Sequence, residues 1–188
     1  MHLVADVLDD FPAVLAAAAR GDGRAFEALF HWLATPVARY LRSCRVDDPD
    51  DLANEVFLRV FRGLSHFEGG AEAFRSWVFT IAHNAASDDR RRAARRPRLV
   101  TGPVDDAPGS DAADAALEHL SREQVEALLD RLPPDQRDVY LLRVVADLSV
   151  SETAAVLGKN YEAVKALQRR GAARLKLLLT ADTEVVPK

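Results

Sequence analysis

The side chains best placed to do chemistry in this sequence are cations, and they lie in two runs. Residues 90–98 carry six arginines and no acidic residue, and residues 159–176 carry six lysines and arginines against Glu162 alone. The arginines of the first run are Arg90, Arg91, Arg92, Arg95, Arg96 and Arg98. Runs of this kind bind the phosphates of a polyanion. One run alone also fits a solvated helix face, but two in separate parts of the chain favour nucleic-acid binding.

The second run has the residue order of a helix that reads the major groove. Such a helix presents base-reading side chains near its N-terminus and phosphate-binding cations further along. The early residues are Tyr161, Glu162, Lys165 and Ala166, and the later ones are Gln168, Arg169, Arg170 and Arg174. Glu162 can accept a hydrogen bond from cytosine, and Lys165 can donate one to guanine.

The segment before this helix supplies the turn that would place it. The sequence predicts a short helix that Ser149 or Ser151 can cap and that ends at Gly158, where a tight turn needs a positive φ. The next helix is expected over about 161–178. Its buried positions are Val164, Leu167 and Leu175. These elements are typical of a helix-turn-helix, although any two helices joined by a glycine turn share the pattern.

Three further helices are predicted in the first half of the chain, each with one apolar stripe at intervals of three and four residues. The first stripe lies within residues 25–33. The second consists of Leu52, Val56, Phe57, Val60, Phe61 and Leu64. The third helix is expected to bury Phe74, Trp77, Val78, Ile81 and Ala82, with Arg75, Phe79, His83 and Asn84 on its other faces.

The second of these helices also carries a polar strip on its other face. The strip consists of Asp51, Asn54, Glu55, Leu58, Arg59 and Arg62, which share helical spacing. It is either a coat of solvated side chains or a contact surface for a partner.

Composition limits the fold. The chain has 188 residues, 48% of them hydrophobic and 29% charged, which suffices for one domain or two small ones with a core. No alternating run indicates a strand, so the predicted class is all-α. The segment TGPVDDAPGSDAAD at 101–114 is too polar to order itself. We therefore expect two small helical domains joined by a flexible acidic linker, the second a helix-turn-helix domain.

Composition also excludes several functions. A single cysteine and scattered histidines leave no zinc site and no disulfide framework. No carboxylate pair, nucleophile with its base or phosphate loop indicates an enzyme or a cofactor. No apolar stretch reaches about 18 residues, and the first ten residues are acidic, so we expect a cytoplasmic protein without membrane insertion.

Four motifs in order resemble those of bacterial RNA polymerase sigma factors of the extracytoplasmic-function (ECF) subgroup of the sigma-70 family. They are DPDDLANEVFLRVF at 48–61, FRSWVFTIAHN at 74–84, LPPDQR at 132–137 and the segment 148–174. The resemblance covers nearly the whole chain. It implies sigma region two over residues 1–98, a linker over 99–118 and sigma region four over 119–188.

The resemblance implies a role for each surface. The polar strip, here Asp51, Asn54, Glu55, Leu58 and Arg59, would dock on the β′ clamp helices of core RNA polymerase, and region four would meet the β flap. The minus-ten element would be contacted, and one unstacked base captured, by Ser65, Phe67, Arg75, His83, Asn84, Arg90 and Arg91. The minus-thirty-five duplex would be read by Tyr161, Glu162, Lys165, Ala166, Arg169 and Arg170.

Two further implications concern the linker and regulation. In such factors the acidic linker enters the template and RNA-exit channels of the polymerase, although a plain spacer explains the composition equally well. An anti-sigma factor often holds both modules. The sequence departs from the common pattern at Asn54, where glutamine is usual, at Glu68, where arginine is frequent, and at residues 160–162, where smaller residues are common.

Two other functions compete with this one. One is a helix-turn-helix regulator that binds promoter DNA without polymerase, and the other is a helical adaptor that binds only proteins. A plain regulator has no use for the strip at residues 51–59, and an adaptor has no use for a basic helix after Gly158.

Overall fold

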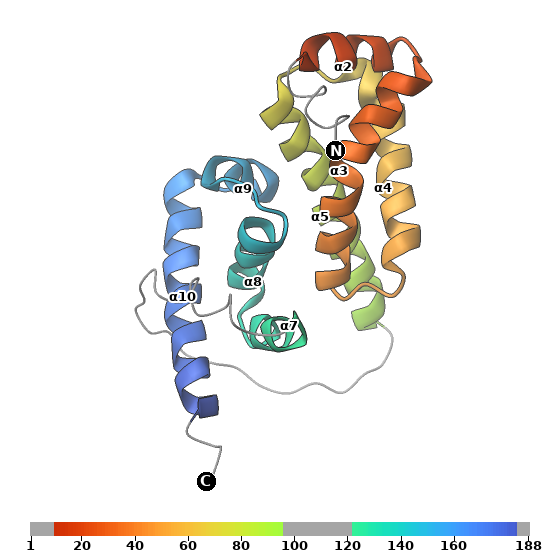
Figure 1. Ribbon diagram of the computed structural model, residues 1–188. Helices are drawn as coiled ribbons and strands as arrows, with labels where there is room; N and C mark the ends of the chain where they lie inside the picture. Colours follow the sequence, from red (N-terminus) through yellow and green to blue (C-terminus); the bar gives the residue numbers. More distant parts are fainter. Residues whose placement is uncertain (1–9, 96–121, 184–188) are drawn as a thin grey trace. The chain divides into compact units, whose positions relative to one another are not determined.

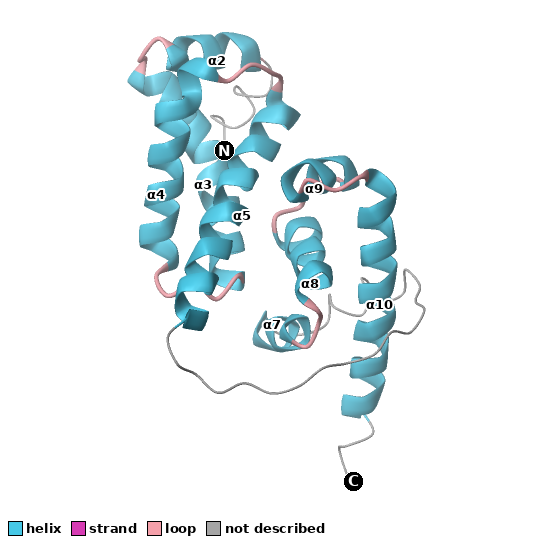
Figure 2. Ribbon diagram, turned by 180° about the vertical axis from the view of Figure 1, so that it is seen from behind, coloured by secondary structure: helices cyan, strands magenta, loops and turns pink. Residues whose placement is uncertain are grey.

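The computed structural model describes residues 10–95 and 122–183, and the secondary structure within these ranges is helical, with no strand (Figures 1 and 2). The chain splits into two compact units; the first contains α2 to α5, and the second contains α7, α8 and α10. We describe α9 with the second unit because it joins α8 to α10 in the chain. The all-α prediction is confirmed. The predicted linker at 99–118 lies outside the described residues.

The first unit is a bundle in which α2 (Phe11–Ala19) lies across one end of α3 (Gly23–Ser43), α4 (Pro49–Gly63) and α5 (Ala71–Arg95) (Figure 1). The sequence analysis missed α2, whose signals are the cap at Asp10 and a proline in the first turn. Asp22 caps α3 by accepting hydrogen bonds from two backbone amides. The buried residues of α3 are Leu29, Leu33, Val37, Tyr40, Leu41 and Ser43.

The helix α4 begins at Pro49 because Asp48 caps it, accepting from the amide of Asp51 at 3.0 Å. Its buried residues are Val56, Phe57 and Val60. The prediction that Phe61 is buried is wrong: this side chain is 53% exposed. It lies at the edge of the stripe, where the ring of Phe26 packs on it edge-on at a centroid distance of 5.1 Å.

A short 3-10 turn, η1 (Leu64–His66), connects α4 to α5. The helix α5 buries Phe74, Val78 and Ala82 as predicted, but the expectation that Phe79 lies on another face is wrong, since it is fully buried. Both α3 and α4 pack on α5, so a wider arc of this helix is covered than one stripe. The Phe79 ring lies edge-on to Tyr40 of α3 at 5.7 Å.

The second unit consists of α7 (Arg122–Asp130), α8 (Pro134–Tyr140), the π-helical turn η2 (Leu141–Val145), α9 (Val150–Leu157) and α10 (Tyr161–Thr183). In it α10 packs along α8 and also contacts α7 (Figure 2). In the run at 139–145, Val139, Tyr140, Leu141 and Leu142 are buried, Arg143 and Val145 are half-buried, and Val144 is 46% exposed.

Candidate nucleic-acid and protein-binding surfaces

The helices on either side of the turn at Gly158, α9 and α10, are each capped by side-chain hydrogen bonds at their start. Ser149, one of the two predicted caps, forms a reciprocal capping box with Glu152: Ser149 Oγ accepts from the Glu152 amide at 3.1 Å, and Glu152 Oε2 accepts from the Ser149 amide at 2.7 Å. Gly158 has φ +60° and ends α9. Asn160 Oδ1 then accepts from the amide of Ala163 at 2.7 Å and caps α10. The start of α10 is therefore held in one orientation.

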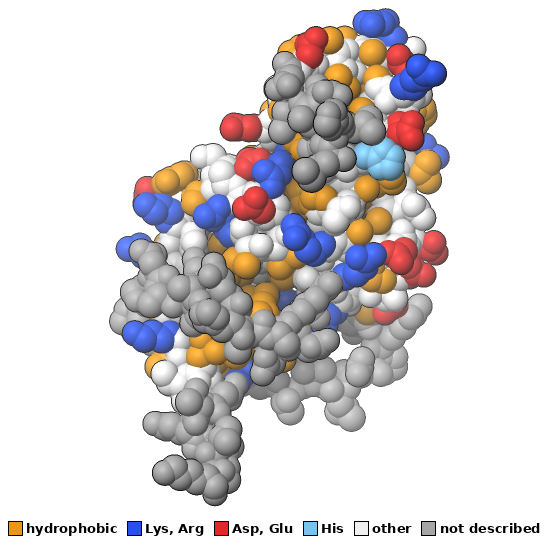
Figure 3. Space-filling view, in the orientation of Figure 1, with side chains coloured by type: hydrophobic (Ala, Val, Ile, Leu, Met, Phe, Trp, Pro, Cys, Tyr) orange, Lys and Arg blue, Asp and Glu red, His pale blue; other side chains and the backbone are white. Residues whose placement is uncertain are grey.

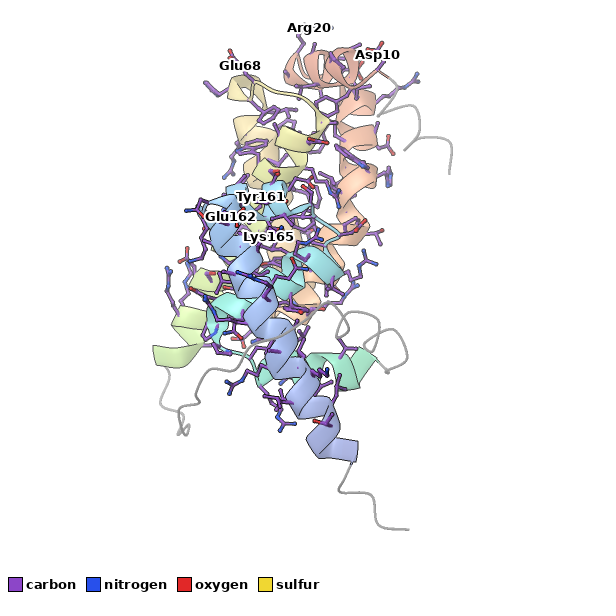
Figure 4. All side chains as sticks on the ribbon, turned by 90° about the vertical axis from the view of Figure 1, so that its left-hand side faces the viewer. Asp10, Arg20, Glu68, Tyr161, Glu162 and Lys165 are labelled. Atoms are coloured by element: carbon purple, nitrogen blue, oxygen red, sulfur yellow. The ribbon has the colours of Figure 1, made fainter. Side chains whose placement is uncertain are left out.

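The first turns of α10 present the side chains predicted to read DNA. Tyr161, Glu162 and Lys165 lie close together there, and all three are exposed (Figure 4). Arg169 and Arg170 are also exposed, whereas Ala166 is half-buried. Val164 and Leu167 are buried between them and fix which face of the helix points out. Lys and Arg side chains are spread over the surface around α9 and α10 (Figure 3).

Two contacts missed by the sequence analysis hold α10 against α8. A Cβ on Gly171 would lie 2.7 Å from Cε2 of the buried Tyr140, so only glycine fits against that ring. Lys159, in the turn before α10, forms an ion pair with Asp135 of α8 at 3.3 Å. Neither contact follows from a sequence period, because each depends on which helix lies opposite.

The polar strip of α4 is exposed at every predicted position. Asp51, Asn54, Glu55 and Arg59 are exposed polar residues, and the apolar side chain Leu58 among them is 54% exposed. Arg59 donates to Glu55 Oε1 at 2.5 Å, which orders two of these side chains. An apolar side chain exposed within a charged border is a common composition for a protein-binding surface.

An aromatic cluster supports Phe67, the predicted base contact. The half-buried Phe67 ring stacks on Trp77 of α5 at a centroid distance of 5.0 Å and an interplanar angle of 27°. Phe74 lies behind both, edge-on to Phe67 at 5.3 Å, and also contacts Phe11 of α2 and Trp32 of α3. The sequence analysis had taken Trp77 as core and did not connect it with Phe67.

Glycines make room for this cluster. A Cβ on Gly63 would lie 2.8 Å from Trp77, and Gly69, with φ +150°, would place one 3.1 Å from the Phe67 ring. The connection between α4 and α5 is therefore built closely around the two stacked rings. Glu68, beside Phe67, is exposed at the same end of the unit as α2 (Figure 4).

The predicted minus-ten contacts on α5 are spread along the helix and lie on several of its sides. Trp77, Asn84 and Arg91 follow at intervals of seven residues, two helical turns, so they lie along one side of α5. Arg75 and His83 lie on other sides, and the His83 ring is hydrogen-bonded through Nδ1 to Tyr40 Oη at 3.0 Å.

The remaining members of the set make local contacts. Ser65 Oγ lies 3.1 Å from His66 Nδ1, Arg90 donates to Ser87 at 3.2 Å, and Arg91 pairs with Asp88 at 3.1 Å. The side chains of Arg95, Arg96 and Arg98 lie outside the described residues. Within the described ranges, no group of three or more acidic, histidine or cysteine residues could hold a metal ion. No described helix is long and apolar enough to cross a membrane.

Both units match known protein families. Residues 25–96 match the family model for sigma-70 region 2, and residues 122–175 match the model for sigma-70, region 4. The ECF RNA polymerase sigma factor SigD of Mycobacterium tuberculosis is 34% identical, over 87% of this chain and 81% of SigD. The ECF RNA polymerase sigma factor BldN of Streptomyces coelicolor is 35% identical, over 86% of this chain and 63% of BldN.

A third relative is similar in both sequence and three-dimensional structure. The RNA polymerase sigma factor CnrH of Cupriavidus metallidurans is 33% identical in sequence, over 94% of this chain and 98% of CnrH. The structure of CnrH in complex with the cytosolic domain of CnrY matches with a TM-score of 0.69 at 29% identity, covering 90% of this chain and 97% of that chain.

Proposed function

This chain belongs to the extracytoplasmic-function sigma factors of the sigma-70 family, and we propose that its two units divide promoter recognition between them. Its relatives are RNA polymerase sigma factors, and the role of this family is promoter-specific transcription initiation. The proposal concerns which residues do this: region two over residues 1–98, an acidic connection over 99–118 and region four over 119–188.

In this proposal α10 enters the major groove of the minus-thirty-five element. The observation that carries it is the capped turn before α10, which leaves Tyr161, Glu162 and Lys165 exposed at the helix start while Val164 and Leu167 hold its other side in the core. Arg169 and Arg170 follow on the same helix and would bind phosphates.

The strip at residues 51–59 would bind the β′ clamp helices of core polymerase. Its support is the exposure of Leu58 within a ring of charged and amide side chains, two of which are ordered by the ion pair between Glu55 and Arg59. The second unit would meet the β flap. No covalent chemistry is needed in either contact, so the chain acts by binding alone.

The end of the first unit around Phe67 would capture one unstacked base of the minus-ten element. Extruding a base costs a few kcal/mol, and stacking on an aromatic ring returns about 1–3 kcal/mol per base. Phe67 is held by Trp77 on one side and is half-exposed. Asn84 and Arg91, on the Trp77 side of α5, would contact base edges and phosphates, and Ser65, Arg75, His83 and Arg90 complete the proposed set.

A partner that holds the factor inactive is also part of the proposal. CnrH is seen bound to the cytosolic domain of CnrY, and an anti-sigma factor of that kind would compete with polymerase for this chain. Co-purification from the native cell should recover such a partner, and recovery with polymerase alone under all growth conditions would count against it.

The test is run-off transcription with core RNA polymerase and fragmented genomic DNA, with and without the protein, followed by sequencing of the transcript starts. We expect new starts that share two upstream elements. Glu55→Ala should weaken polymerase binding but leave DNA contacts intact, and Arg169→Ala should do the reverse. Losing one phosphate contact should also reduce the salt dependence of promoter affinity by a slope of about one.

Matched controls come from α3, which carries none of the proposed contacts. Glu27→Ala and Arg39→Ala each remove one exposed charge of the same sign from that helix and should leave transcription unchanged. Equal losses for all four variants would indicate misfolding. Binding to duplex DNA without any initiation would instead favour a regulator that acts without polymerase.

A further inference from the structure

Tyr161 is an exposed aromatic side chain in contact with a cation. It occupies the first position of α10 and is 47% exposed, so it contributes little to the core. The Lys165 ammonium, one helical turn later, lies 5.6 Å from the centroid of its ring. This distance is within the range of a cation–π interaction.

The Lys165 ammonium contacts the Tyr161 ring although the carboxylate of Glu162 is also nearby. Glu162 stands three residues before Lys165, at a spacing where a carboxylate can pair with an ammonium. No ion pair links them in the described part of the chain, and the Lys165 ammonium lies over the ring instead. Glu162 is exposed and keeps its carboxylate available, while the lysine amine lies over the Tyr161 ring.

The backbone beneath this pair is fixed independently. Asn160 caps the helix, Val164 is buried between Tyr161 and Lys165, and Lys159 ties the preceding turn to Asp135 of α8. A free lysine side chain has several rotatable bonds and loses entropy when it is fixed. On a fixed backbone, one ring contact is enough to limit where its amine points.

We propose that Tyr161 is a positioning residue that holds the Lys165 ammonium for donation to O6 and N7 of a guanine in the minus-thirty-five duplex. The inference rests on the proposed function of α10 and adds a specificity determinant to it. The side chain at residue 165 lies within the first two turns, where a recognition helix reaches base edges. Guanine offers two adjacent acceptors in the major groove, which suit a cationic donor. Exclusion of water in the groove would strengthen the contact between ring and ammonium.

The pair differs from the cations that follow it. Arg169 and Arg170 are exposed and make no ion pair within the described ranges, so their guanidinium groups can follow the phosphates. The structure thus distinguishes a positioned cation at the helix start, suited to one base, from unconstrained cations that suit the backbone.

The experiment uses the full chain assembled with core polymerase on a promoter identified by the run-off assay. Each guanine of the minus-thirty-five element is replaced in turn by 7-deazaguanine, which lacks the N7 acceptor. The measured quantity is the ratio of the two promoter affinities. At one guanine we expect the wild-type protein to bind the guanine promoter more tightly than the 7-deazaguanine promoter. Lys165→Met should bring this affinity ratio to one, and Tyr161→Leu should lower it about two- to fivefold. Tyr161→Phe, which keeps the ring, should rescue it.

The outcomes separate this inference from the proposed function. If Lys165→Met abolishes the ratio but Tyr161→Leu leaves it unchanged, Lys165 reads guanine unaided and the inference is overturned. If Tyr161→Phe lowers the ratio as much as Tyr161→Leu, the hydroxyl acts and not the ring, which also overturns it. If no guanine gives a ratio above one and Arg169→Ala has no effect on affinity, the proposed function of α10 itself fails.

Discussion

The proposed DNA contacts of the second unit are, apart from the half-buried Ala166, exposed side chains of α10, whereas those of the first unit include half-buried side chains that pack against its core. Lys165 and Arg169 stand on a helix whose opposite side does the packing. Phe67 is half-buried against Trp77, and His83 is hydrogen-bonded to the buried Tyr40. Reading a duplex needs only a correctly oriented helix, but receiving a flipped base needs a rigid prepared surface.

This difference implies that folding and DNA contact are separable in the second unit and coupled in the first. Replacing an exposed cation of α10 should change binding without changing stability. Replacing a ring around Phe67 should change both. The following predictions test this contrast. The stability of the first unit can be followed separately by fluorescence because both tryptophans, Trp32 and Trp77, lie in it.

The largest effect is expected for Phe74→Ala. Phe74 is 1% exposed and contacts Phe11, Trp32, Phe67 and Trp77. Its loss should lower the free energy of unfolding of the first unit by about 3–5 kcal/mol, as for other buried aromatic truncations. Urea unfolding followed by tryptophan fluorescence measures this, and promoter opening by the holoenzyme should fall in parallel. Phe74→Leu should cost much less, and promoter opening that survives Phe74→Ala would break the proposed coupling.

The next effect is expected in the second unit, for Gly171→Ala. The added Cβ would meet the buried ring of Tyr140 at 2.7 Å. Overpacking costs about 1–3 kcal/mol, and the higher helix propensity of alanine returns up to about 1 kcal/mol. We therefore expect a net loss of stability of about 1 kcal/mol, measured by circular dichroism. Gly23→Ala, with nothing within 4 Å of its added Cβ, is the control and should not destabilise.

Much of the second unit follows from sequence because its determinants are local. The capping box of Ser149 and Glu152, the turn at Gly158 and the exposed start of α10 each depend on residues at most four apart. The exposed strip of α4 follows from the helical period in the same way. The approach of Gly171 to Tyr140 does not, because it joins residues on two helices.

The first unit was harder to predict because its site depends on packing between helices. The burial of Phe79 reflects cover from α3 and α4 together, which the apolar pattern of α5 alone does not indicate. The support of Phe67 by Trp77 joins a connection to a helix face, and α2 lies in an alanine-rich segment with a weak periodic signal. Sequence spacing assigned Phe61 to the core because it cannot tell the middle of a stripe from its edge.

An effect of similar size is expected at the cap of α9. Ser149→Ala removes the acceptor for the Glu152 amide and should cost the second unit about 1 kcal/mol. Ser151→Ala changes an exposed serine in the same turn and should stay within about 0.5 kcal/mol. Thermal unfolding of the two variants measures the difference. Equal costs would assign the cap to both serines, as the sequence alone allowed.

The smallest stability effect is expected for the ion pair of Glu55 and Arg59, whose side chains are 48% and 43% exposed. A double-mutant cycle with alanine at both positions should give a coupling of about 0.3–0.5 kcal/mol, typical of exposed pairs one helical turn apart. The same four proteins should differ far more in affinity for core polymerase, because an interface excludes the water that screens these charges on the free protein. A coupling that is equally small in both assays would mean that the strip contributes solubility and not binding, and it would remove the main reason for assigning α4 to the polymerase.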